Sequence, residues 1–129
     1  ESWEYVLDSS RRARGFALYA TLRSLGRAGV RALVERCCEL AVQLAARLRD
    51  EDGVEVLNDV VLNQVLVRFG DDDAHTRAVI TGVQEEGVAW MGGTVWKGKA
   101  AMRVSVSNWS TTPEDIDKTA DAILRAHRA

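Results

Sequence analysis

Apolar residues recur at three- and four-residue steps through the first part of the chain, a spacing typical of helices. One such pattern covers 10–25, and Gly26 with Gly29 supplies a place for the helix to end. A second pattern starts near Gly29 and continues to Leu48, before the polar stretch 49–53. The sequence therefore predicts two consecutive helices that are separated at the glycines.

From residue 54 onward, short apolar runs alternate with turn residues and one-sided helical patterns. These patterns predict strands over 54–57 and 60–69, a helix opened by 70–73 and ending near Glu86, strands over 88–96 and 99–107, and a helix over 113–127. Gly92 and Gly93 allow a bulge or the close approach of another backbone. The order predicts an α+β fold, in which a mostly antiparallel sheet of about four strands carries helices on one face and follows long helices.

The strand near the C-terminal end carries one arginine among alternating apolar residues. Alternation between 102 and 107 puts Arg103, Ser105 and Ser107 on the polar face of this strand. An arginine held in a strand can orient a carboxylate or a phosphate through two parallel hydrogen bonds. A solvent-exposed arginine or an ordinary ion pair is the alternative interpretation.

The segment after this strand contains a strong helix-start signal. Thr112 can cap the following helix, Pro113 suits its first position, and Asp115 is placed to complete a capping box. We therefore expect a rigid turn beside the arginine strand.

Length and charge exclude several classes of protein. A chain of 129 residues is long enough for one domain and too short for most two-lobed cofactor enzymes. The formal net charge of -2, with both signs interspersed, gives no broad basic surface, so we expect no nucleic-acid partner. No apolar run approaches the roughly 18 residues of a membrane span. We expect a soluble, cytoplasmic protein with no membrane partner.

Few residues offer metal-binding or nucleophilic chemistry. Cys37 and Cys38 are neighbours within a helical pattern, so a mutual disulfide is excluded and small core residues are expected. His75 and His127 are far apart in the sequence and complete neither a metal site nor a catalytic triad. We therefore predict no metal ion.

A basic cluster, Arg11, Arg12 and Arg14, precedes the first predicted helix. Arginines at a helix start oppose the helix dipole, so a partner explains them more readily than the helix does. They are candidates for an interface or for contact with an anion.

Three segments together resemble one family. Residues 8–26, DSSRRARGFALYATLRSLG, look like the stretch that follows the cofactor-lysine region in group II pyridoxal-phosphate (PLP)-dependent amino-acid decarboxylases. Residues 33–41, LVERCCELA, are similar to the family's long helix leading into its small domain. Residues 101–108, AMRVSVSN, with TT and EDID after them, resemble its C-terminal strand, turn and helix. The family includes aromatic-amino-acid and glutamate decarboxylases.

The resemblance implies a homodimeric enzyme of fold type I, of which this chain is the C-terminal part. Residues 1–28 would link to a missing large domain, and residues 29–129 would form the small domain. The family attaches its cofactor to a lysine after a histidine, and Lys97, Lys99 and Lys118 lack that context. PLP is therefore expected in the full-length enzyme but not covalently on this chain, which would contain no catalytic residue and be inactive alone.

Arg103 matches the arginine that contacts a substrate carboxylate in glutamate decarboxylase-like members of the family. If Arg103 clamped the carboxylate that departs, it would stabilise the ground state of the reaction. Arg103 is therefore expected to bind a distal carboxylate of the substrate or to place the amino acid correctly. Arg103 is therefore the candidate substrate-binding residue.

Other functions fit the same residues. An aminotransferase of the same fold would use Arg103 to clamp the α-carboxylate. A stand-alone module could bind amino acids between helices and sheet. An interaction domain could bury an apolar face on missing protein, including Trp3, Trp90, Trp96 or Trp109, although core packing is the commoner role of tryptophan.

Overall fold

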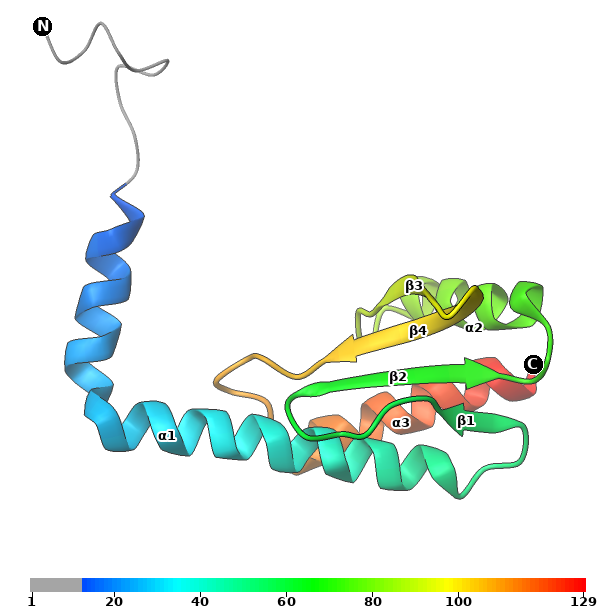
Figure 1. Ribbon diagram of the computed structural model, residues 1–129, viewed down its shortest axis with the longest axis horizontal. Helices are drawn as coiled ribbons and strands as arrows, with labels where there is room; N and C mark the ends of the chain where they lie inside the picture. The colour runs from blue at the N-terminus through cyan, green and yellow to red at the C-terminus, as the bar shows by residue number, and fades with distance from the viewer. Residues whose placement is uncertain (1–12) are drawn as a thin grey trace, which may run out of the picture. The chain divides into compact units, whose positions relative to one another are not determined.

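A computed structural model of the protein describes residues 13–129. Its elements are α1 (Arg14–Arg49), β1 (Val54–Val56), β2 (Gln64–Phe69), α2 (Asp73–Glu86), β3 (Gly92–Trp96), β4 (Lys99–Ser105) and α3 (Pro113–Arg128). The chain divides into two compact units, Glu1–Ala32 and Leu33–Ala129. The sheet lies in the second unit (Figure 1).

Helix α1 contains the two predicted helices, joined at the predicted glycine. Gly26 has φ 61° and ψ -176°, which is not helical, so the helix is interrupted there. Gly29 stays within the helix, so the break involves one glycine and not both. The helix starts at Arg14, and residue 10, where we expected its start, lies outside the described residues.

The four strands form one antiparallel sheet in the order β1-β2-β4-β3. Alternate residues of the strands point to a single core, which also contains one face of α2, one face of α3 and the second stretch of α1. The core residues of β2 and β4 are Val65, Val67, Phe69, Met102 and Val104. The predicted α+β class, with about four strands and helices on one sheet face, is confirmed (Figure 1).

All four strands are shorter than predicted, and β1 ends at Val56 and not at residue 57. β2 starts at Gln64 and not at residue 60, and β4 ends at Ser105 and not at residue 107. Beyond both ends, the Asn63 side chain donates to the Val106 carbonyl. The Val106 N–H donates in turn to the Asn63 carbonyl. This exchange closes the sheet where the ladder stops.

The β3–β4 hairpin is confirmed, with its two-residue turn at Lys97 and Gly98, whose φ values of 50° and 81° suit a primed turn. β3 starts at Gly92 and not at residue 88. Of the two alternatives for the paired glycines, a bulge is not what the structure has, since Gly92 and Gly93 stand opposite Arg103 and Met102 in continuous register.

Trp90, Trp96 and Trp109 are exposed and take no part in the core, which is filled by aliphatic residues, Met and Phe69 instead. Cys37 is buried and Cys38 is half-buried, and neither is in a disulfide. These three tryptophans therefore do not have the core role that is commoner for tryptophan, and Trp3 lies outside the described residues.

Candidate substrate-binding surface

The sheet face opposite the core presents Arg103 at the middle of β4. Arg103 is exposed between the buried residues Met102 and Val104, as the alternation predicted. Its cross-strand partners are Leu66 in β2 and Gly92 in β3. Within residues 13–129, the Arg103 guanidinium has no ion-pair or hydrogen-bond partner.

A polar pair lies one step further along the same face. Gln64 stands opposite Ser105, and its side-chain Nε2 donates to the Ser105 hydroxyl oxygen at 3.2 Å. The Oε1 of this amide remains an acceptor near the arginine strand. The central strands therefore carry a guanidinium, an amide and a hydroxyl on one exposed face.

The turn after β4 is held at several points. Arg36 of α1 donates to the Trp109 carbonyl, and the Asn108 side chain accepts from the Ser110 N–H and hydroxyl at 3.0 Å each. These contacts support the rigid turn that the sequence predicted.

The capping box at the start of α3 is confirmed. The Thr112 hydroxyl accepts from the Asp115 N–H at 3.2 Å, and Asp115 Oδ2 accepts from the Thr112 N–H at 3.0 Å. Hydrogen bonds from the Thr112 backbone and hydroxyl lower the pKa of Asp115. The helix start is therefore fixed by an ionised carboxylate near its positive end.

Arg68 is a buried structural cation that sequence reasoning missed. Its guanidinium lies 2.6 Å from Asp73 Oδ1 and also donates to the carbonyls of Ala100 and Asp71, at 2.8 and 2.6 Å. Hydrogen bonding to Arg68 and to the Ala100 N–H lowers the pKa of Asp73. The sequence contains a signal for this pair, because Arg68 interrupts an apolar strand near its end, a few residues before the acidic run 71–73.

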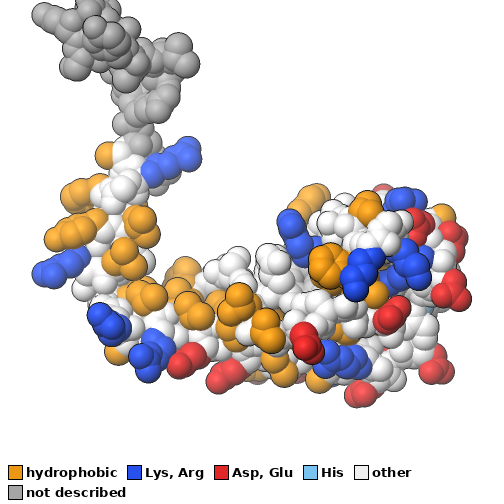
Figure 2. Space-filling view, viewed as in Figure 1, with side chains coloured by type: hydrophobic (Ala, Val, Ile, Leu, Met, Phe, Trp, Pro, Cys, Tyr) orange, Lys and Arg blue, Asp and Glu red, His pale blue; other side chains and the backbone are white. Residues whose placement is uncertain are grey.

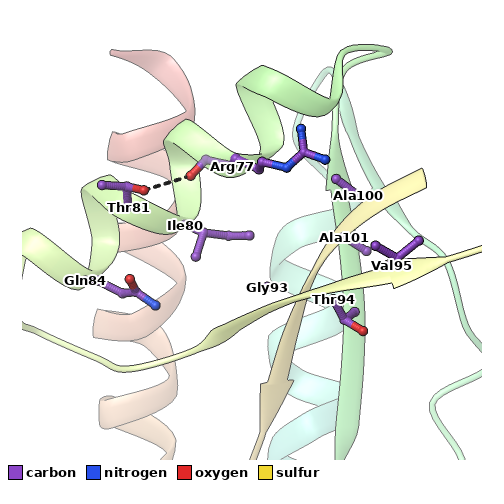
Figure 3. Close-up of a pocket in the computed structure, with 9 residues that line it drawn as sticks. All are labelled: Arg77, Ile80, Thr81, Gln84, Gly93, Thr94, Val95, Ala100 and Ala101. Carbon is purple, nitrogen blue, oxygen red and sulfur yellow. Dashed lines mark hydrogen bonds between the residues drawn. The ribbon is translucent and has the colours of Figure 1, made fainter. Parts of the chain in front are cut away.

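A groove of about 450 Å³ lies between α2 and the β3–β4 hairpin (Figure 3). Its lining residues are Arg77, Ile80, Thr81, Gln84, Gly93, Thr94, Val95, Ala100 and Ala101. Ile80 points from α2 toward the strands, and the Arg77 guanidinium lies toward the Ala100 end (Figure 3). Arg103 does not line this groove.

A second, more apolar cavity of about 340 Å³ lies within the Leu33–Ala129 unit. Its lining residues are Leu33, Val34, Cys37, Cys38, Leu62, Asn63 and Ser107. It contains neither a charged side chain nor Arg103, so it offers no site for an anion.

The first stretch of α1 exposes much apolar surface, visible along that helix in Figure 2. Its exposed large apolar side chains are Phe16, Leu18, Tyr19, Leu22 and Leu25. Arg14 is exposed at the first residue of this helix, while Arg11 and Arg12 lie outside the described residues.

The described residues do not fit a PLP site. Lys97 lies in the hairpin turn, 5.9 Å from the Trp96 ring centre, Lys99 begins β4 and Lys118 lies on α3. All three lysines are exposed, and neither cavity contains a lysine that could bind the cofactor covalently. Over residues 13–129, no group of three metal-ligating side chains is present, and no helix has the length and apolar character needed to cross a membrane.

The amino-acid sequence matches a family model described as the pyridoxal-dependent decarboxylase conserved domain, over residues 1–70. The chain belongs to the pyridoxal-dependent decarboxylase family. This confirms the family resemblance on which the candidate role of Arg103 depends, although the matched range ends before Arg103.

Solved structures from the same family have the same fold as this pyridoxal-dependent decarboxylase chain. Oryza sativa TDC with PLP and tryptamine is similar with a TM-score of 0.82 and 19% identity, over 95% of this chain and 28% of that chain. Catharanthus roseus tryptophan decarboxylase in complex with L-tryptophan has a TM-score of 0.82 and 17% identity, over 95% and 28% of the two chains. Because 95% of this chain is covered, these matches include most of the residues beyond the range of the family model.

A third similar structure comes from Vibrio parahaemolyticus. It is the glutamate decarboxylase domain of diaminobutyrate-pyruvate transaminase and L-2,4-diaminobutyrate decarboxylase, with a TM-score of 0.73 and 22% identity, over 86% of this chain and 25% of that chain. The chain thus spans between a quarter and a third of the length of these structures.

Proposed function

We propose that the chain is the C-terminal part of a longer PLP-dependent amino-acid decarboxylase, a carboxy-lyase, in which Arg103 contacts the substrate. The observation that carries the proposal is the exposed Arg103 guanidinium, which has no side-chain partner among residues 13–129. An exposed guanidinium without a side-chain partner is available for two parallel hydrogen bonds to a carboxylate. Its strand is central in the sheet, so its position is well defined.

In this proposal, residues 1–28 connect the small domain, residues 29–129, to a large domain of the same polypeptide. The exposed apolar side chains of the first stretch of α1 support this division, because large apolar patches mark surfaces that other protein covers. Arg11, Arg12 and Arg14 then belong to a domain or subunit interface. The complete enzyme is a cytoplasmic homodimer of fold type I.

The large domain supplies the cofactor in this proposal. PLP acts as an electron sink when bound, and that chemistry needs a lysine and a ring-binding pocket. The exposed positions of Lys97, Lys99 and Lys118 support the view that this chain does not bind PLP covalently. The chain by itself is then inactive.

Arg103 binds a distal anionic group of the substrate or orients the amino acid. It does not clamp the carboxylate that departs, because an ion pair there would be lost as the charge leaves and would favour the ground state. A distal contact persists through the reaction and positions the bond that breaks.

The coding sequence upstream of Glu1 gives the first test. A histidine followed by a lysine in the family's context supports the proposal, and a start codon with no such lysine removes it. The second test uses the full-length polypeptide with PLP and a panel of amino acids. Carbon dioxide and an amine identify a decarboxylase, whereas a keto acid and transfer of the amino group identify an aminotransferase.

A stand-alone amino-acid-binding module is distinguished by calorimetry on this chain alone. Heat that saturates at micromolar amino acid would favour the module. The decarboxylase proposal expects no such saturation, because the larger part of the site lies on the other domain.

A further inference from the structure

We infer that Gly92 leaves the space through which a long substrate group reaches Arg103, an inference that rests on the proposed function. Gly92 stands directly opposite Arg103 in the β3–β4 ladder. Directly opposed residues have Cβ positions about 5 Å apart on the same sheet face. Gly92 therefore presents bare backbone beside the arginine, where any other residue would present a side chain.

Nothing in residues 13–129 requires glycine at this position. An added Cβ at Gly92 would meet no heavy atom within 4 Å. Its φ is not in the left-handed region, and the ladder with β4 is continuous there. A glycine inside a strand weakens that strand and often marks a place where a ligand or another backbone approaches closely. The free space beside an unpaired guanidinium points to a ligand group.

Side chains lie beside Arg103 on the β2 side and toward the end of β4. Leu66, on the β2 side, is half-buried and forms an apolar wall. Gln64 and Ser105 occupy the next position along the face and are hydrogen-bonded to each other. The open side is therefore the β3 side, over Gly92.

This geometry suits an amino acid whose side chain ends in a carboxylate. The carboxylate binds the Arg103 guanidinium through two hydrogen bonds, and the methylene spacer passes over the Gly92 backbone. A side chain at Gly92 would occupy the space of that spacer, and it would affect long substrates more than short ones.

Gly93 provides a matched control in the same strand. It stands opposite Met102, and a Cβ added there would lie 3.5 Å from Ile80 Cδ1, on the side of α2 (Figure 3). A substitution of Gly93 therefore tests packing of the hairpin without entering the space beside Arg103.

The experiment measures binding of succinate, glutarate and adipate to the full-length protein by calorimetry, together with kcat/KM for acidic amino acids of increasing length. The variants are Gly92→Ala, Gly92→Val, Gly93→Ala and Arg103→Ala. We expect Gly92→Val to weaken binding of the longest dicarboxylate about tenfold relative to the shortest, the scale of discrimination that a methylene or two provides. Gly92→Ala, which adds one methyl group to open space, should shift the same ratio less, and Gly93→Ala should leave it unchanged.

Two results would overturn the inference. If Gly92→Val and Gly92→Ala leave the length preference unchanged while Arg103→Ala weakens binding, Gly92 does not provide space for the substrate and the proposed function stands. If Arg103→Ala changes neither dicarboxylate binding nor kcat/KM, the proposed function fails and the role of Gly92 fails with it.

Discussion

Arg68 and Asp73 together bind both backbone polar groups of Ala100, its N–H and its carbonyl. The Arg68 guanidinium donates to the Ala100 carbonyl at 2.8 Å, and Asp73 Oδ1 accepts from the Ala100 N–H at 3.0 Å, while the two side chains lie 2.6 Å apart. The β2–β4 ladder ends at Val67 and Met102, and the ion pair binds the β4 backbone two residues beyond that end, at Ala100. It joins β2, α2 and β4 in one contact.

We predict that Arg68→Ala lowers the free energy of unfolding by about 2–3 kcal/mol, because the Ala100 carbonyl loses its buried donor and Asp73 its charge partner. Urea unfolding followed by circular dichroism measures the loss. Arg77→Ala is the matched control, since Arg77 contacts the same carboxylate at 3.5 Å but is 64% exposed. Arg77→Ala should lower the free energy of unfolding by less than about 0.5 kcal/mol. Equal losses of stability in the two variants would contradict a special role of Arg68.

The pKa of Asp73 predicts acid sensitivity. Its pKa is lowered in the folded protein by hydrogen bonds from Arg68 and from the Ala100 N–H. The associated stability is therefore present above the unfolded pKa of about 4 and is lost as pH falls through the lower folded value.

Asp73→Asn should remove this part of the pH dependence when unfolding is measured between neutral and acidic pH. The matched control is Asp71→Asn, because Asp71 contacts Arg68 through its backbone carbonyl, which the substitution retains. An unchanged pH profile in Asp73→Asn would show that other carboxylates account for the acid sensitivity.

The capping box predicts a local cost at the start of α3. Thr112→Ala should destabilise the protein by about 1 kcal/mol, because the Asp115 N–H loses its acceptor and Asp115 loses a donor. Thr111→Ala is the adjacent control, and thermal unfolding measures both variants. A loss as large in Thr111→Ala would mean that the turn, and not the cap, provides the stability.

Arg103→Ala in the full-length enzyme should lower kcat/KM by the equivalent of about 2–4 kcal/mol, the loss expected for a charge-assisted substrate contact. Arg103→Lys should recover only part of this, because an ammonium lacks the two-pronged geometry of guanidinium. Lys99→Ala removes a positive charge from the same strand and serves as the control. Steady-state kinetics that give equal losses for Arg103→Ala and Lys99→Ala would indicate a general charge effect and no specific contact.

Local signals in the sequence were reliable where the partners lie within a few residues. The interruption at Gly26, the capping box of Thr112 and Asp115, and the hairpin turn at Gly98 all follow from the backbone and side chains of neighbouring residues. The exposed position of Arg103 followed from alternation alone.

The predicted strand starts that were wrong lie where a side chain bonds to the backbone. Residues 60–63 do not extend β2, and there the Asn63 side chain donates to the carbonyl of Val106, which lies 43 residues away. Residues 88–91 do not extend β3, and there the Gln84 side chain donates to the Met91 carbonyl at 2.7 Å. Neither contact leaves a periodic signal in the sequence.

The sequence by itself therefore determined the elements, their turns and caps, the polar face that carries Arg103 and the family resemblance. Only the tertiary structure decided the strand order β1-β2-β4-β3, the pairing of Arg68 with Asp73 around Ala100, and the position of Gly92 opposite Arg103. The physical reason is that helix starts and alternation depend on contacts between near neighbours. Strand order and register depend instead on how the apolar faces of distant segments pack into one core.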